Sequence, residues 1–134
     1  ELGSHVVFLR PLGLRLDERG EIAAVQNRAP QFDVGANTDV MTGGQKAACC
    51  MMLLRAMRPD VLAFDEISAP EDIEAIRIAA GCGVALLATA HAQSVAALRH
   101  RALYRALLDE HIFRRAVCIT RSDGERVYTV EDLT

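Results

Sequence analysis

The sequence predicts an α/β fold in which helices flank a mainly parallel sheet and a C-terminal β-hairpin follows. Residues 61–64 and 84–88 are short runs that are apolar throughout, as is typical of strands buried on both faces of a parallel sheet. Helix-start and helix-stop residues lie between and after these runs, which gives the alternation of strands and helices found in α/β folds. Near the end, Ser122-Asp123-Gly124 separates two strand-like runs, as in a β-hairpin.

The first predicted elements are a short strand, a long loop region and a buried helix. Residues 14–17 form a strand-like run that ends in a charged cluster. Residues 22–44 are rich in Asn, Gln, Asp, Gly and Thr. We expect an ordered loop region there, since so long an irregular stretch in a compact domain is usually functional. Residues 45–57 combine strong helix formers with apolar residues on every side, which predicts a largely buried helix that ends before Pro59.

A strand and a helix are predicted next. The apolar run 61–64 ends at Asp65-Glu66, as expected for a buried strand. Pro70 then opens a helix with acidic residues in its first turn, where they suit the helix dipole. Gly81 ends this helix.

The remaining elements follow the second apolar run. After residues 84–88, Ser94 is the expected N-cap of a helical stretch, and a further helix is expected near residues 103–110. The two strands of the hairpin are expected at residues 113–120 and 126–130.

The composition is that of one globular domain spanning residues 1–134. The chain has 134 residues, of which 51% are hydrophobic, so it can bury a core. Its formal net charge of -3 provides no overall positive field for nucleic acid or an anionic membrane. The longest apolar run, residues 47–54, is far shorter than the ~20 residues that cross a bilayer, and no leader-like segment opens the chain. We expect a soluble, unprocessed protein or a piece of one.

The cysteines indicate a reducing compartment. All four lie in apolar stretches and none forms a C-x-x-C pair, so we expect reduced core residues of a cytosolic protein. They are Cys49, Cys50, Cys82 and Cys118.

Four apolar residues followed by Asp65-Glu66 is an arrangement that nucleotide hydrolases use. In such sites the Asp reaches Mg²⁺, usually through water, while the Glu orients or deprotonates the attacking water. The alternative interpretation is a helix N-terminus that begins with acidic residues. In open α/β sheets the ligand crevice lies at the carboxyl ends of the strands, which is where this pair is expected.

Polar residues also follow two other predicted strands, at Asp17-Glu18-Arg19 and at Thr89-Ala90-His91. The first group could supply a second carboxylate to the same site, because neighbouring strands are roughly 5 Å apart, but a solvated turn has the same pattern. Thr89 and His91 could sense the γ-phosphate or orient water, but a lone His more often has a structural role.

The sequence lacks the phosphate-binding loop G-x-x-x-x-G-K-[ST], whose glycines free backbone amides and whose Lys reaches the β and γ oxygens. The nearest approach is Gly43-Gly44-Gln45-Lys46-Ala47. Its Lys comes one place too late and Ala stands where Ser or Thr belongs. Because no hydrophobic strand precedes it, we interpret it as a loop that leads into a helix.

An ordered set of strings points to one known family. DERGEIA, PQFDVG and TDV lie in the first part of the chain, and PDVLAFDEI, APED and LLATAHA lie in the second. Read together, they resemble the stage III sporulation protein AA family, from roughly residue 14 to the end. Members of this family are similar to the ATPases of type II and type IV secretion and serve endospore formation in Gram-positive bacteria.

The resemblance implies a partial RecA-like P-loop NTPase domain that uses ATP and Mg²⁺. Asp65-Glu66 matches the Walker B pair, with Asp65 reaching Mg²⁺ through water, and Thr89 with His91 matches the histidine box. The acidic box matches residues 17–21, and either Glu18 or Glu66 is the general base. The phosphate-sensing residues would be Thr89, Arg19 and Glu21, with His91 as a further catalytic residue.

The resemblance also implies partners and a location. A homo-oligomer, by analogy a hexamer, would act with membrane-embedded sporulation channel proteins, from the cytoplasm at the mother-cell face of the forespore membrane. Many members carry Arg before Thr-Asp-Val, where this chain has Asn37. The family's Walker A loop lies upstream of the acidic box, so we expect the chain to be a fragment, a divergent copy or an engineered form that begins after it.

Three functions of different classes remain. The first is the hydrolytic half of a sporulation ATPase. The second is a non-hydrolysing interaction domain that kept the fold and lost nucleotide binding. The third is a nucleic-acid motor, which the acidic balance and the 4% aromatic content disfavour, because basic grooves and stacking platforms are missing.

Overall fold

The computed structural model describes residues 13–16, 23–27, 29–41 and 45–134. These residues form two compact units, one made of the described residues up to Ala88 and the other of Thr89–Thr134. The prediction of one domain over residues 1–134 stays a prediction. Each unit is described by itself.

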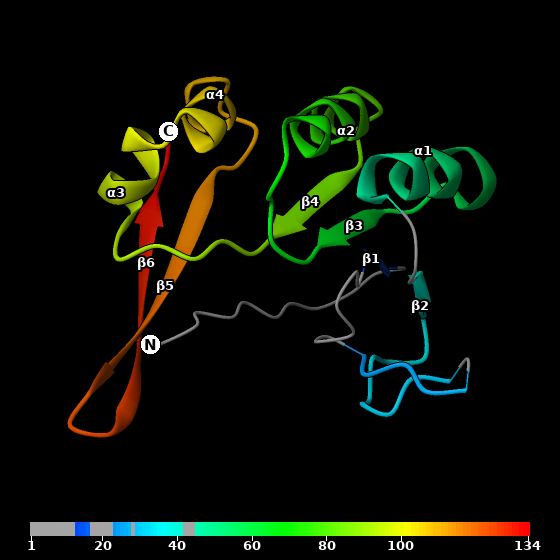
Figure 1. The fold of residues 1–134 in the computed structure, drawn as a ribbon, viewed down its shortest axis with the longest axis horizontal. Helices are drawn as coiled ribbons and strands as arrows, with labels where there is room; N and C mark the ends of the chain where they lie inside the picture. The colour runs from blue at the N-terminus through cyan, green and yellow to red at the C-terminus, as the bar shows by residue number, and fades with distance from the viewer. Residues whose placement is uncertain (1–12, 17–22, 28, 42–44) are drawn as a thin grey trace. The chain divides into compact units, whose positions relative to one another are not determined.

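The first unit contains a parallel sheet of four described strands in the order β2-β1-β3-β4 (Figure 1). The strands are β1 (Gly13–Leu16), β2 (Thr38–Met41), β3 (Val61–Phe64) and β4 (Ala85–Ala88). Because every pairing is parallel, the carboxyl ends of all four strands lie at one edge. The predicted α/β class and the parallel pairing of β3 with β4 are therefore confirmed.

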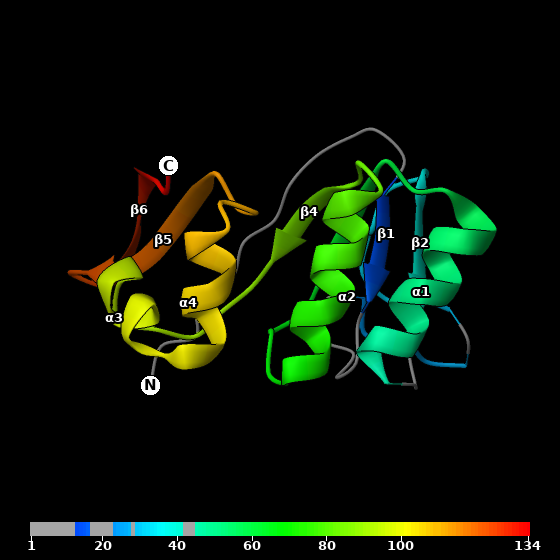
Figure 2. The same ribbon diagram turned by 90° about the horizontal axis from the view of Figure 1, so that it is seen from above.

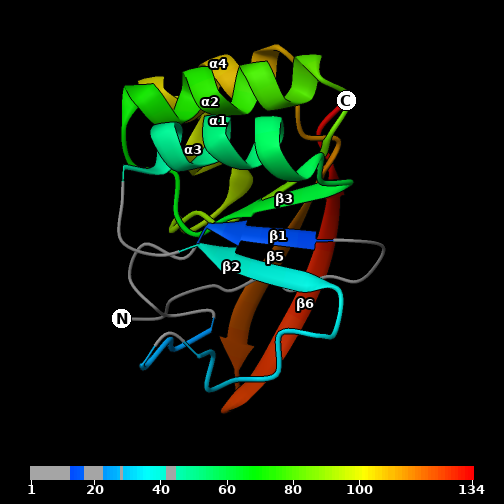
Figure 3. The ribbon, with the colours of Figure 1, turned by 90° about the vertical axis from the view of Figure 1, so that its right-hand side faces the viewer.

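Two helices cover one face of this sheet, α1 (Lys46–Met57) and α2 (Pro70–Gly81), as Figures 2 and 3 show. Both follow the predicted bounds closely, since Pro70 opens α2 and α1 ends just before Pro59. Between helices and sheet lies a core of fully buried side chains, to which β3, α1 and α2 all contribute. Its largest members are Phe64, Leu62, Ile76 and Cys50.

Strand β2 corrects the prediction that residues 22–44 form only a loop region. Thr38–Met41 has a polar Asp39 in its middle and no continuous apolar run, so periodicity gave no signal for it. It forms a strand because it pairs with β1 along its length, from Gly13↔Thr38 to Leu16↔Met41. Tertiary pairing thus decides a segment whose own strand propensity is weak.

Strand β4 and the cysteines need smaller corrections. The apolar run at residues 84–88 predicts a strand buried on both faces, but β4 is the last of the described strands in the sheet. Its four residues are half-buried or exposed.

All four cysteines are free, as predicted, but only Cys50 is buried and Cys82 is exposed. Cys82 follows directly after α2, where the chain has left the helix-packed core.

The second unit contains two short helices and a hairpin (Figure 1). Ser94 caps α3 as predicted, because its hydroxyl accepts a hydrogen bond from the Ala97 amide at 3.1 Å. The turn of the hairpin uses Asp123 and Gly124, whose φ angles of 51° and 85° match the primed turns that suit twisted strands. The elements are α3 (Val95–His100), α4 (Ala102–Asp109), β5 (Arg115–Ser122) and β6 (Glu125–Asp132).

Within the described part of the chain, no helix is long and apolar enough to cross a membrane.

Candidate active site

Asp65 and Glu66 follow β3 directly, at the carboxyl edge of the parallel sheet. This is the edge at which open α/β sheets bind ligands. Asp65 is only 7% exposed, and Glu66 is half-buried. The structure therefore places the acidic pair where the sequence predicted it.

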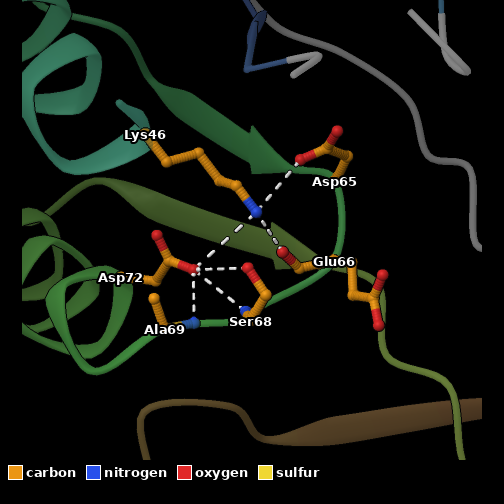
Figure 4. Close-up of polar contacts among 6 residues, drawn as sticks. All are labelled: Lys46, Asp65, Glu66, Ser68, Ala69 and Asp72. Carbon is orange, nitrogen blue, oxygen red and sulfur yellow. Dashed lines mark hydrogen bonds and ion pairs between the residues drawn. The ribbon is translucent and has the colours of Figure 1, made fainter. Parts of the chain in front are cut away.

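A buried lysine contacts this pair. Lys46 is the first residue of α1, and its Nζ lies 3.4 Å from Oδ1 of Asp65 and 3.7 Å from Oδ2 of Asp72. The same ammonium donates a hydrogen bond to the backbone carbonyl of Glu66. All four residues converge in Figure 4. The side chains of Lys46, Asp65 and Asp72 are each no more than 9% exposed, so we call these three residues the buried charge cluster.

Asp72 is fixed by the loop that precedes α2. Its Oδ2 accepts hydrogen bonds from the backbone amides of Ser68 at 2.9 Å and Ala69 at 3.0 Å, and from the Ser68 hydroxyl at 3.4 Å. Ala69 occupies the N-cap position and has no side-chain oxygen to cap the helix. The Asp72 carboxylate therefore satisfies amides that the start of a helix otherwise leaves without partners.

The buried charge cluster is held together by charge. A Lys at the first position of a helix is unfavourable, because the N-terminus carries the positive end of the helix dipole. Burying an ammonium or a carboxylate is also costly unless the charge is paired. Two carboxylates and the Glu66 carbonyl offset both costs for Lys46. The cluster therefore joins the starts of both helices to the end of β3.

The side chain of Glu66 and its backbone carbonyl point in different directions. Its carbonyl faces Lys46 while its carboxylate points away from the buried charge cluster (Figure 4). A half-buried carboxylate at the edge of a sheet can accept a proton from a water molecule, which is what a general base does.

The carboxylate of Asp65 suits a Mg²⁺ ion that it contacts through water. Carboxylate oxygen is the donor that Mg²⁺ prefers, and the ion usually keeps several waters and takes substrate phosphates as further ligands. Among the described residues, no group of three His, Cys, Asp or Glu side chains could hold a metal ion. The protein would therefore contribute Asp65, and the ammonium of Lys46 at 3.4 Å would compete with the ion for that carboxylate.

The other predicted site residues lie either outside the described residues or in the second unit. Glu18, Arg19 and Glu21 lie outside the described residues. Thr89 and His91 follow β4 and belong to the second unit, where the His91 carbonyl accepts a hydrogen bond from Nη1 of Arg101 at 2.9 Å. Whether these residues share a site with Asp65 stays a prediction.

Sequence reasoning missed the roles of Lys46 and Asp72. A helix does begin at Lys46, as predicted, and the last described residue before position 45 is Met41, which ends strand β2. The Lys46 side chain is nonetheless turned into the protein, with 7% of the residue exposed. One signal could have found it, because a lone Lys at the start of an apolar, buried helix needs a partner of opposite charge.

Comparison with known proteins identifies the family. The family model described as "Sporulation stage III, protein AA" matches residues 11–131. Stage III sporulation protein AA of Bacillus subtilis (strain 168) is 36% identical over 109 residues, which are 81% of this chain and 36% of the relative. This chain belongs to the stage III sporulation protein AA family. It spans about a third of the length of the curated relative, 36%, and no solved structure is significantly similar to it.

Family membership agrees with the resemblance predicted from the sequence. The matched residues 11–131 include Lys46, Asp65, Glu66 and Asp72, so the whole cluster lies inside the region that defines the stage III sporulation protein AA family. The chain is therefore a sporulation protein by family.

Proposed function

We propose that this chain is the hydrolytic part of a RecA-like sporulation ATPase, in which Asp65 and Glu66 act on ATP bound by a longer protein. The observation that carries the proposal is the position of the pair. Asp65 and Glu66 end a buried strand at the carboxyl edge of a parallel sheet, and the Glu66 carboxylate points out of the buried charge cluster. An acidic pair at that edge is the arrangement used by nucleotide hydrolases.

Each residue would have a separate task. Mg²⁺, when bound with ATP, would neutralise charge that develops on the phosphates. Asp65 would contact that ion through water, and either Glu66 or Glu18 would take the proton of the attacking water. The residues that sense or position the phosphates would be Thr89, His91, Arg19 and Glu21.

The proposed setting follows from the family. We propose a homo-oligomer, by analogy with secretion ATPases a hexamer, that acts with membrane-embedded sporulation channel proteins and does not bind nucleic acid. The protein would work in the cytoplasm, at the mother-cell face of the forespore membrane. The net charge of -3 gives no general attraction to anionic lipids, so any membrane association would depend on protein partners.

Hydrolysis by a longer family protein that contains the phosphate-binding loop tests the proposal. Glu66→Gln or Glu18→Gln should lower kcat by about 10²-fold or more and leave nucleotide binding in place, because only the water-activating group is removed. Steady-state turnover of both variants identifies the base. Wild-type turnover that neither substitution changes would refute a role for both carboxylates.

A non-hydrolysing interaction domain is the second candidate. One observation favours it, since Lys46 already neutralises Asp65 at 3.4 Å. Longer family proteins that keep their oligomeric state and channel partners without any ATP turnover would support this function over the first.

A further inference from the structure

We propose that Lys46 is a positioning residue for the Asp65-Glu66 pair and that it acts as the resident cation of the buried charge cluster. It holds Asp65 when no divalent cation is bound, and it keeps Asp72 and the Glu66 carbonyl as partners when such a cation takes Asp65. This inference rests on the proposed function, because it concerns the same two acidic residues.

The geometry defines the place of the ammonium. A protonated Lys has three N–H donors and no acceptor. The three groups that the structure describes around it lie on separate parts of the chain, namely the end of β3, the first turn of α2 and the backbone carbonyl of Glu66. With 7% of the residue exposed, water competes little for these donors. The ammonium therefore occupies a built cation site rather than a solvated surface position.

The two carboxylates of the cluster are held differently. Oδ2 of Asp72 accepts from the amides of Ser68 at 2.9 Å and Ala69 at 3.0 Å, which fixes it to the start of α2. Asp65 lies at the end of a strand, on the edge where a ligand would arrive. If Asp65 turned towards a bound cation, Lys46 would keep its contacts with Asp72 and with Glu66. Exchange at Asp65 thus removes one of the three contacts that the structure describes for the lysine, and the other two remain.

The same lysine controls Glu66. Because Nζ holds the carbonyl of Glu66, the peptide is oriented so that the carboxylate leaves on the side away from the cluster (Figure 4). A substitution that removes the ammonium releases this peptide as well as Asp65. Lys46 therefore couples the charge at Asp65 to the direction of the proposed base.

The first test uses Mn²⁺ alone, without nucleotide, on the 134-residue chain. Binding is followed by the electron paramagnetic resonance signal of free Mn²⁺. Lys46→Met removes a like charge 3.4 Å from the Asp65 carboxylate, so Mn²⁺ should bind at least tenfold more tightly than to the wild type. Lys46→Arg keeps the charge and should bind Mn²⁺ as weakly as the wild type. The double variant Lys46→Met/Asp65→Asn should lose the gain.

Controls exclude effects of general charge and of misfolding. Arg115→Met removes a cation from an exposed ion pair in the second unit and should leave Mn²⁺ affinity unchanged. Lys46→Gln keeps N–H donors for Asp72 and provides a second neutral variant. The melting temperatures of the neutral variants should be lower than that of the wild type in EDTA and should rise with Mn²⁺. Folded neutral variants with wild-type Mn²⁺ affinity would overturn the proposal, as would neutral variants that stay unfolded at saturating Mn²⁺.

The second test distinguishes positioning from stability in the longer, loop-containing protein. Lys46→Met should lower kcat at least tenfold per folded molecule while the KM for ATP changes less than about threefold, and Lys46→Arg should restore part of kcat. Equal kcat in folded Lys46→Met would overturn the positioning role. Absence of turnover in the wild type would instead refute the proposed function, and the Mn²⁺ measurements would still decide the cation exchange.

Discussion

Removal of the Asp72 carboxylate should destabilise the first unit by an amount that the local contacts allow us to work out. In Asp72→Ala, the amides of Ser68 and Ala69 lose their acceptor, and a donor left without a partner costs about 1–3 kcal/mol when buried. Water can reach this partly buried loop, which places each amide near the lower limit. Lys46 also loses one of two buried carboxylates, and breaking a buried ion pair costs about 3–5 kcal/mol when no partner remains. Because Asp65 remains, we expect a total loss of about 3–5 kcal/mol.

Asp72→Asn separates the two contributions. The Asn side-chain oxygen can still accept from both amides, so only the charge at 3.7 Å from Lys46 is lost, and we expect a loss of about 1–3 kcal/mol. Urea unfolding of the 134-residue chain, followed by circular dichroism, gives the free energy of unfolding of each variant. Glu74→Ala is the matched control on the same helix, because its pair with Arg77 is exposed and should contribute less than about 0.5 kcal/mol. Equal losses for Ala and Asn, or a loss below about 1 kcal/mol for Ala, would refute the reasoning.

Three further predictions concern the core, a thiol and the nucleotide. Leu62→Ala should lower the free energy of unfolding by about 2–5 kcal/mol in the same urea experiment, because this fully buried side chain would leave a cavity. A loss below about 1 kcal/mol would contradict its place in the core. Burial, together with the neighbouring thiols of Cys82 and Cys49, raises the pKa of Cys50 to about 11 from 9.0. The neutral buried thiol therefore stabilises the fold below pH 9, and this contribution is lost as the pH rises from 9 towards 11. We expect iodoacetamide at pH 8 to label exposed Cys82 before Cys50, and rapid labelling of Cys50 would contradict its burial. In Cys50→Ala, this loss of stability between pH 9 and 11 should be absent. Finally, calorimetric titration of MgATP into residues 1–134 should show weak binding or none, because the sequence offers no phosphate-binding loop, and micromolar binding with phosphate release would contradict this.

The strongly apolar elements of the fold could be predicted from the sequence. Strand β3 was predicted with its observed bounds, Val61–Phe64, because a strand buried by helices and by neighbouring strands must be apolar on both faces. Helix α2 was predicted from Pro70 and Gly81, which begin and end it for local reasons. Strand β2 could not be predicted in this way. Thr38–Met41 is a strand because of its register with β1, and a pairing partner distant in sequence leaves no local pattern.

In the candidate site, too, some residues follow from local sequence patterns and others depend on tertiary packing. Asp65 and Glu66 were predicted because they end an apolar run, which a single sequence displays. The contact of Lys46 with Asp65 spans two elements, α1 and the end of β3, and depends on how the helix packs on the sheet. The sequence shows that the acidic residues in the first turn of α2, Asp72 among them, suit the helix dipole, and the structure adds the hydrogen bonds that Asp72 accepts from the amides of Ser68 and Ala69. Local sequence patterns therefore could not predict which charged residues from different elements meet in the folded protein.

The central claim is that the carboxyl end of β3 is the hydrolytic site, and a crystal structure of the longer family protein tests it most directly. The crystal should contain Mg²⁺ and an ATP analogue that cannot be hydrolysed. We expect the γ-phosphate to lie at this end of β3, with Asp65 joined to Mg²⁺ through water and with Lys46 still bound to Asp72 and to the Glu66 carbonyl. A nucleotide bound elsewhere, with Asp65 still paired with Lys46, would contradict the claim.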